Sequence, residues 1–496
     1  MNDINKKNNK VFYISLIFST SIVLWGIIGQ TSFASAANSL LHFLSKYFGW
    51  SYLLSMLIFV IFAVALAFSK YGNIKLGADD SKPEYSTASW FAMLFGAGMG
   101  IGLVFWGTAE PISHFVKPLG DIAPGSLEAS DFAIKTSFMH WGFHPWANYS
   151  IIGLALAYFQ FRKNKPGLIS SIFIPLLGEK RVQGPIGNLI DILAVFATVS
   201  GVATSLGLGT LQINSGLNYL FNIPETPVVQ IIIISVITVL FIWTAVTGID
   251  KGIKTLGDIN LYLAFGLLSL VIIVGPTLGI INNMTNGLGL YLNDFLKDSL
   301  GISAFGDNSW LEGWRIFYWA WWIAWAPFVG SFIARISKGR TIKEFVGGVI
   351  VAPALASIVW FSAFGSLGLN LIDKVGVEGI AVMTEAPETA LFQVLKYYPL
   401  GNILSLVTVA LLCTFFITSA NSATFVLGML TSEGNLNPNR NRKVLWGLIQ
   451  SFLATALLLS GGLQALQTAS VAAAFPFIFV MLFAMVSLMK ALKTEI

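Results

Sequence analysis

Long apolar runs separated by short polar segments dominate the pattern of this chain. A helix needs about 20 apolar residues to cross the hydrocarbon core of a bilayer. Runs of this kind occupy the segments 11–30, 51–69, 88–107, 136–160, 188–220, 228–248, 258–281, 314–334, 344–370, 401–430, 444–462 and 469–490. The pattern therefore predicts an all-α polytopic membrane protein with twelve transmembrane helices.

The basic residues between these runs predict an orientation. With an even number of spans, both termini lie on the same side of the membrane. Of the 29 Lys and Arg residues, 22 fall in the terminal tails and the even-numbered loops. Cytoplasmic loops carry an excess of Lys and Arg. We therefore expect a multi-pass protein of the plasma or inner membrane with both termini in the cytoplasm.

Three segments allow more than one interpretation. The basic N-terminus and the first apolar run resemble a cleavable signal peptide, but the run 11–29 exceeds a typical signal core of about 7–15 residues. We therefore expect a retained first helix. Leu288–Leu300 fits either an interfacial segment or an ordinary loop, and Thr384–Tyr398 fits either a short amphipathic surface helix or an ordinary loop.

Composition supports the membrane class and excludes several others. The chain is 55% hydrophobic and 11% charged, whereas soluble domains carry about 25% charged residues. A single cysteine, Cys413, and four histidines exclude a disulfide framework and give no zinc-enzyme motif. The scattered basic residues form no nucleic-acid-binding run. We expect neither an enzyme nor a nucleic-acid partner, and no cofactor apart from a coupling ion.

The third predicted span contains a glycine-rich run from Gly96 to Gly102. One interpretation is close helix packing, because Gly98 and Gly102 have the small-xxx-small spacing. The other is a broken helix whose freed N–H and carbonyl groups bind ions or substrate. The sequence favours neither interpretation over the other.

Aromatic side chains gather on the fourth and eighth predicted spans. At about 100° per residue, Trp141, Trp146 and Tyr149 share one face of the fourth span, and the eighth carries Trp321, Trp322, Trp325 and Phe328 on one side. An interfacial aromatic belt explains Trp310 and Trp314. The deeper indoles suit a quaternary ammonium ion, which has no N–H group and is held by ring faces.

Few other polar groups lie within the spans. The tenth span contains Thr418 and Ser419, whose hydroxyls could bond to backbone or supply oxygen ligands to Na⁺. Glu110 and Asp191 lie near span ends, and the sequence reveals no chain of carboxylates for a proton relay.

These motifs resemble the betaine–choline–carnitine transporter family. The residues that carry the resemblance are Gly98–Gly102, Trp141–Gly142, the tryptophan-rich run Phe317–Gly330 and the run Thr418–Thr424. The resemblance implies twelve helices, in which spans three to seven and eight to twelve form an inverted repeat. It divides the chain into segments 1–87, 88–284, 285–309, 310–490 and 491–496, and it implies a homotrimer.

The resemblance also implies binding residues. An aromatic box would hold substrate through Trp141, Trp146, Tyr149, Trp321, Trp322 and Trp325, with backbone groups of Gly100, Ile101 and Gly102 facing its carboxylate. A first sodium site would use Gly96, Met99, Phe415, Thr418 and Ser419. A second sodium site would use Thr198 and Phe328.

Two departures from the family pattern concern the ions. Val202 replaces a hydroxyl expected one turn after Thr198, which weakens the second sodium site. Asn421 replaces an aspartate common in the family. The segment 188–220 contains no Lys or Arg, unlike carnitine antiporters that dispense with sodium.

We therefore expect import of a trimethylammonium osmolyte, most simply glycine betaine, by symport with Na⁺. A choline or carnitine transporter, with H⁺ as the coupling ion, is the alternative. A channel would require repeated polar rings, and a membrane enzyme would require a catalytic constellation. The sequence shows neither.

Overall fold

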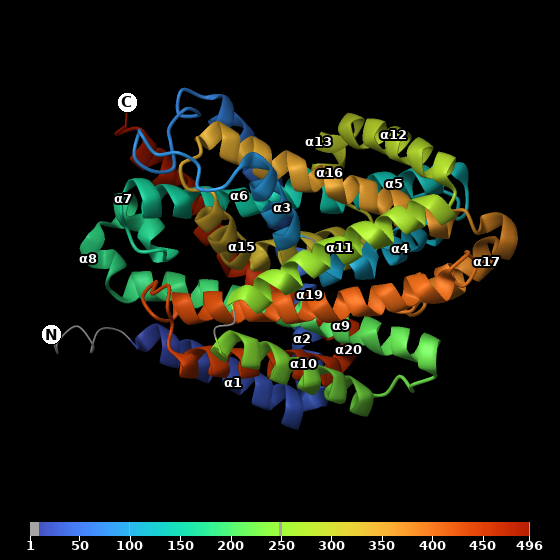
Figure 1. Ribbon diagram of the computed structural model, residues 1–496. Helices are drawn as coiled ribbons and strands as arrows, with labels where there is room; N and C mark the ends of the chain where they lie inside the picture. The colour runs from blue at the N-terminus through green and yellow to red at the C-terminus, as the bar shows by residue number, and fades with distance from the viewer. Residues whose placement is uncertain (1–8, 99, 248–249, 496) are drawn as a thin grey trace.

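The computed structural model describes residues 9–98, 100–247 and 250–495, and helices account for nearly all of its regular structure (Figure 1). Across these ranges there is no β-strand, and the β contact that occurs is an isolated antiparallel bridge between Lys75 and Thr341. The all-α prediction is confirmed.

The long helices are α1 (Lys10–Ile28), α2 (Gln30–Phe68), α3 (Thr87–Gly98), α4 (Ile101–Val116), α5 (Leu127–Trp141), α6 (Phe143–Ala157), α9 (Pro185–Phe221), α10 (Pro227–Thr247), α11 (Asp250–Val274), α12 (Thr277–Asn293), α15 (Phe317–Ile336), α16 (Ile342–Leu369), α17 (Ile372–Thr384), α19 (Gly401–Leu430) and α20 (Arg440–Leu492). Shorter helices are α7 (Ile174–Leu177), α8 (Glu179–Val182), α13 (Phe295–Leu300), α14 (Ser309–Leu311) and α18 (Ala390–Leu395), with π-helical turns at Tyr158–Arg162 and Glu312–Ile316 and a 3₁₀ turn at Ser170–Phe173.

Among the described residues, nine helices are long and apolar enough to cross a bilayer, or ten when the bent pair α3 and α4 is counted as one span. The predicted number was twelve. The difference arises where spans are interrupted or fused. The predicted fourth span is divided into α5 and α6, and the predicted eleventh and twelfth are the two halves of α20, which is kinked at Gly461 and Gly462. Each predicted span overlaps helical structure, but several boundaries differ.

Gly142 separates α5 from α6 because another helix approaches its backbone closely. A Cβ at this position would lie 2.8 Å from the Tyr291 hydroxyl of α12 and 2.5 Å from the carbonyl oxygen of Phe138. The Tyr291 hydroxyl accepts a hydrogen bond of 3.0 Å from the N–H of Phe143. This N–H belongs to the first turn of α6 and has no partner within its own helix. The break therefore keeps its polar backbone satisfied inside the protein.

Of the two segments with open interpretations, the first is largely helical and the second contains one short helix. Leu288–Leu300 is covered by the end of α12 and by α13. Thr384–Tyr398 contains α18, in which Leu391 and Leu395 are buried. The ordinary-loop interpretation is therefore wrong for Leu288–Leu300, whereas in Thr384–Tyr398 it is wrong only for Thr384 and α18. Burial of α18 also means that it packs within the bundle instead of lying on its surface.

Helices from the two halves of the chain pack against each other. α15 contacts both α6 and α9, and α20 runs along α9 and α2. α1 begins, and α20 ends, toward the left of Figure 1, where α7 and α8 also lie. The tryptophan-rich α15 is buried along most of its length. This arrangement encloses the aromatic side chains of the fourth and eighth predicted spans within the bundle.

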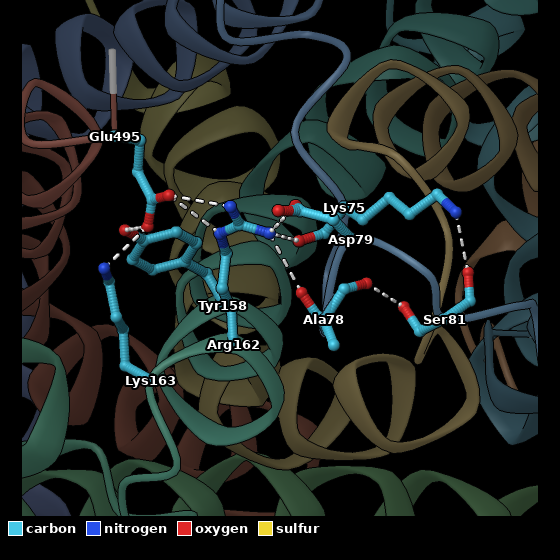
Figure 2. A network of polar contacts seen from close by, with 9 residues as sticks. Lys75, Ala78, Asp79, Ser81, Tyr158, Arg162, Lys163 and Glu495 are labelled. Carbon is cyan, nitrogen blue, oxygen red and sulfur yellow. Dashed lines mark hydrogen bonds and ion pairs between the residues drawn. The ribbon is translucent and has the colours of Figure 1, made fainter.

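At the end of the molecule where α20 stops, a charged network joins three distant segments (Figure 2). The carboxylate of Glu495 accepts hydrogen bonds from Arg162 at 2.8 and 3.0 Å and from the hydroxyl of Tyr158 at 2.8 Å, and Lys163 lies 2.6 Å from it. Arg162 also donates to Asp79 at 2.8 Å. We call these five residues the C-terminal clamp. It ties the end of α20 to the loops after α2 and α6.

The clamp predicts a pH-dependent stability. The Arg162 guanidinium, assisted by Lys163 and Tyr158, lowers the pKa of Glu495 from 4.5 to about 2. A lowered folded-state pKa stabilises the fold above the usual pKa, and this contribution is lost as pH falls toward the lowered value. We expect Glu495→Gln to cost about 1–2 kcal/mol at neutral pH, measured as a lower melting temperature in detergent. The difference from wild type should shrink below about pH 4.

Asp80→Asn, at an exposed acid next to the clamp, is the matched control and should leave the melting temperature unchanged at both pH values. A Glu495→Gln protein as stable as wild type at neutral pH would contradict a stabilising clamp.

Candidate functional site

The ends of two broken helices and the side chains of α15 enclose a narrow cavity. Its walls consist of Gly100, Ile101, Gly102, Leu103, Trp141, Tyr149, Ser205, Trp321, Trp322, Trp325 and Ser419. The cavity has a volume of about 30 Å³, which is room for about one or two water molecules. A larger ligand therefore requires its walls to move apart.

The glycine-rich run supplies one wall through a break in the third predicted span. α3 and α4 are inclined by 68°, and Gly100 between them has an extended backbone with φ −139° and ψ −160°. The first N–H groups of a helix have no partners within that helix, and Gly100 to Leu103 line the cavity. The helix is broken, as the second interpretation expects. Close packing also occurs, because a Cβ on Gly102 would lie 2.5 Å from Trp321.

Three indoles form the most compact part of the aromatic wall. Trp321 and Trp322 are stacked, with ring centroids 4.8 Å apart and an interplanar angle of 14°. Trp141 stands edge-on to Trp322 at 4.8 Å and 74°. Tyr149 lies further along the wall, 6.4 Å from Trp322. Ring faces and edges from α5, α6 and α15 therefore meet at one cavity.

Of the two remaining predicted box tryptophans, Trp325 lines the cavity and Trp146 does not. Trp146, predicted to share the binding face, is not on the cavity wall and instead packs edge-on against Tyr149 at 5.5 Å and 83°. Trp325 lines the cavity and packs against Phe328 at 5.4 Å. The assignment of Trp141, Trp146 and Tyr149 to one face assumed a continuous helix, whereas α5 ends before Gly142 and α6 begins after it. Contact of Trp146 with substrate, which the family resemblance also implies, stays a prediction.

Hydrogen bonds hold the two crossed indoles in place. The indole N–H of Trp322 donates to the carbonyl oxygen of His140 at 2.9 Å, and the Asn148 amide donates to the carbonyl oxygen of Trp322 at 2.8 Å. The indole N–H of Trp141 donates to Glu110 at 2.8 Å. Glu110 and His140 are fully buried. Sequence analysis noted Glu110 only as a charge near a span end, and it missed His140.

The residues of the expected first sodium site are only partly gathered here. Ser419 lines the cavity, opposite the backbone of Gly100. The Thr418 hydroxyl instead donates to the Thr414 carbonyl at 3.0 Å and accepts from the Asn260 amide of α11 at 2.9 Å. The side chain of Phe415 is buried on the same helix.

Two further positions complete that expected site. Gly96 lies in α3, before the break. Met99 lies outside the described residues, so the structure does not place it.

The residues of the expected second sodium site lie on α9 and α15. Thr198 is buried, and its hydroxyl bonds back to the Ala194 carbonyl at 2.8 Å. Phe328 is buried next to Trp325. Two turns after Thr198, Ser205 lines the cavity. Sequence analysis missed Ser205, although its spacing from Thr198 on one helix could have indicated it.

A further group of potential metal ligands lies behind the aromatic wall. One ligand atom each from Glu110, His114 and His140 lies within 4.8 Å of the others. However, Nδ1 of His140 is 2.6 Å from Glu110, a hydrogen-bond distance that leaves no space for an ion between the two groups. The geometry therefore supports a hydrogen-bonded cluster. Sequence analysis did not identify this cluster.

Comparison with known proteins identifies the family to which this arrangement belongs. Residues 10–496 match the family described as betaine/carnitine/choline family transporters. The glycine betaine transporter OpuD of Bacillus subtilis (strain 168) is 49% identical over 494 residues, which cover 99% of this chain and 95% of the relative. The ectoine/hydroxyectoine transporter of Virgibacillus pantothenticus is 44% identical, with 98% and 97% covered.

A more distant relative is the osmo-dependent choline transporter BetT2 of Acinetobacter baylyi. It is 38% identical, and the matched region covers 99% of this chain and 72% of the relative. The family match extends over nearly the whole described bundle, including both broken helices and the tryptophan-rich α15. The chain therefore belongs to the betaine/carnitine/choline transporter family, a family of polytopic membrane transporters.

Proposed function

We propose that this protein imports glycine betaine across the plasma or inner membrane by symport with Na⁺. The observation that carries the proposal is a cavity with indole rings on one side and the start of α4 on the other. A trimethylammonium group offers no N–H donor and is held by aromatic faces. A carboxylate needs donors, which helix N-termini supply. Glycine betaine carries both groups on one short skeleton.

Choline is the second candidate. It shares the trimethylammonium group but has a hydroxyl where glycine betaine has a carboxylate. The choline transporter of Acinetobacter baylyi is 38% identical, less similar than the glycine betaine transporter of Bacillus subtilis at 49%. Ectoine is a further candidate substrate, because a relative described as an ectoine/hydroxyectoine transporter is 44% identical. Carnitine remains the third trimethylammonium candidate.

Coupling to Na⁺ is supported by the kind of polar groups near the cavity. A zwitterion gains nothing from the membrane potential, whereas each charge moved inward contributes about 2.3 kcal/mol per 100 mV. Na⁺ requires oxygen ligands, which Ser419, Ser205 and the backbone at the start of α4 offer. Val202 lies where the family has a further hydroxyl. We therefore propose one strong sodium site, built around Ser419 and Thr418.

The sequence supports a proposal for the orientation in the membrane, and the family resemblance supports one for the assembly. We propose that both termini lie in the cytoplasm, because Lys and Arg are concentrated in the loops on that side. The loop after α6 carries Arg162 and Lys163, which contact Glu495 near the end of α20. We also propose a homotrimer, with five-helix inverted repeats in each subunit, as the family resemblance implies.

Transport by purified protein in liposomes tests the proposal. With an inward Na⁺ gradient, we expect uptake of labelled glycine betaine above that of choline, carnitine and ectoine. Replacing Na⁺ with K⁺ should abolish accumulation, and a protonophore should not. Uptake that persists in K⁺ but is abolished by the protonophore would exclude sodium coupling. Choline uptake without glycine betaine uptake would exclude the substrate assignment.

The sodium site predicts a second result in the same assay. The double variant Thr418→Ala with Ser419→Ala should raise the Na⁺ concentration for half-maximal uptake about tenfold, equivalent to ~1.4 kcal/mol of lost binding energy. Thr414→Ala is the control, because its hydroxyl bonds to the Ala410 carbonyl on the same helix. An unchanged sodium dependence in the double variant would remove these hydroxyls from the site.

A further inference from the structure

Glu110 of α4 lies behind the aromatic wall and contacts it through one carboxylate oxygen. This oxygen, Oε2, accepts the indole N–H of Trp141 at 2.8 Å and the hydroxyl of Tyr318 at 2.5 Å. The other oxygen lies 2.6 Å from Nδ1 of His140 and 3.4 Å from Nε2 of His114. Glu110 is fully shielded from solvent. Four polar side chains therefore surround the carboxyl group of Glu110, whereas packing of α4 against its neighbours would need none of these contacts.

The same cluster also reaches the second indole of the wall. The carbonyl oxygen of His140, whose ring contacts Glu110, accepts the indole N–H of Trp322. Trp141 and Trp322 are therefore both hydrogen-bonded to one unit, which consists of Glu110 and His140. The indole N–H groups of Trp321 and Trp325 have no hydrogen-bond partner among the described residues. The connection is thus specific to the two crossed rings.

The carboxyl group of Glu110 contacts two histidines but, across the described ranges, no lysine or arginine. Arg315 is buried, but it lies over Trp310 at 5.4 Å, and its guanidinium donates to the Asp298 carbonyl. A buried charge without a cationic partner is costly. A cation in the cavity, one ring away, would supply the missing positive charge.

Hydrogen bonding to a carboxylate also changes what an indole can bind. The negative face of an aromatic ring attracts cations through its quadrupole. An N–H that donates to an anion polarises the ring toward greater negative charge, as hydrogen bonds in a low-dielectric interior polarise one another. Trp141 should therefore bind a cation better than an indole without this acceptor.

We propose that Glu110 is a positioning residue that makes the box selective for positive charge. It acts through Trp141 and, by way of His140, through Trp322. The result is a preference for a trimethylammonium group over a neutral group of the same shape. This inference rests on the proposed function, since it concerns the same cavity. The inference goes beyond the proposed function because it assigns the selectivity for positive charge to Glu110, a residue outside the cavity wall.

The test compares ligands that differ in charge and hardly in shape. Glycine betaine has 3,3-dimethylbutanoate as its isostere, and choline has 3,3-dimethylbutanol, each with a carbon in place of the quaternary nitrogen. Binding to purified full-length protein is measured by calorimetry, or by competition for weak ligands. Wild type should favour each trimethylammonium ligand strongly over its isostere. In Glu110→Gln, which keeps the shape, this preference should fall about tenfold.

Asp191→Asn provides the matched control. Asp191 is also a buried carboxylate, held by the N–H and hydroxyl of Ser170 at 2.9 and 2.7 Å, and it is not on the cavity wall. Its variant should keep the wild-type preference for the cations. If Glu110→Gln does not yield folded protein, Glu110→Asp decides. Aspartate keeps the carboxylate but moves it away from Trp141. The preference of this variant for the trimethylammonium ligands should therefore be weaker than that of wild type and stronger than that expected for Glu110→Gln.

The outcomes separate this inference from the proposed function. Equal weakening of the cations and their isosteres in Glu110→Gln would show a purely structural role and overturn the inference. A wild-type preference retained in Glu110→Asp would overturn it as well. If wild-type protein binds neither glycine betaine nor choline, the proposed function fails first, before any variant is examined.

Discussion

Replacing Trp322 with leucine is expected to raise the apparent KM for glycine betaine about thirtyfold, because a desolvated cation–π contact is worth about 2 kcal/mol. Trp322 meets two other indoles of the wall, stacked on Trp321 and crossed with Trp141, each at 4.8 Å. Its loss would therefore also release the neighbouring rings. The measurement is the concentration dependence of initial uptake in liposomes.

Trp243→Leu is the suitable control, since this tryptophan of α10 is 58% exposed. The sequence pattern predicts Trp310 to be a belt residue, which would make it an alternative control. However, Trp310 lies against His114 at 5.2 Å and beneath Arg315, so its replacement would disturb the buried cluster. Equal increases in KM for the Trp322 and Trp243 variants, both folded, would remove Trp322 from the binding site.

Gly102→Ala is expected to reduce glycine betaine uptake more than tenfold, because over-packing a tight interior costs about 1–3 kcal/mol. The added Cβ would lie 2.5 Å from Trp321 and 3.1 Å from Trp141. The rings would have to move into the cavity. Gly102→Asp would add a negative charge that repels the carboxylate of glycine betaine and attracts choline. Its larger side chain would need the same rings to part. Loss of glycine betaine transport should therefore accompany any gain for choline.

Gly289→Ala in α12 is the matched control for the added methyl group. A Cβ at Gly289 would meet nothing within 4 Å, and alanine favours helix over glycine. Uptake by this variant should equal that of wild type. Wild-type uptake by Gly102→Ala would mean that the cavity between Trp141 and Trp321 is not on the transport path.

Sequence patterns predicted the helices well and the directions of side chains less well. Apolar runs indicated the helices that are long enough to cross a bilayer, since crossing imposes length and composition together. They did not indicate α17, and they reached only the start of α12. Trp146 was placed on the binding face by counting 100° per residue from Trp141. That count fails across Gly142, where α5 ends and α6 begins. Periodicity holds only within an unbroken helix.

Neighbouring residues on a helix also need not face the same cavity. Thr418 and Ser419 are adjacent, so their side chains point about 100° apart. Ser419 faces the cavity, whereas Thr418 is bonded to Asn260. The cluster around Glu110 was beyond sequence reasoning for a different reason. Its partners Trp141 and Tyr318 are 31 and 208 positions away, and no local pattern reports such contacts.

The C-terminal clamp has a practical consequence for protein production. Glu495 is held against Arg162 and Lys163, so an affinity tag or fluorescent protein joined close to Glu495 would lie next to this contact. A bulky fusion there would compete with the clamp during purification. Expression screens should therefore place the tag ahead of α1, or separate it from α20 by a flexible spacer, for which Gly- and Ser-rich linkers are suited.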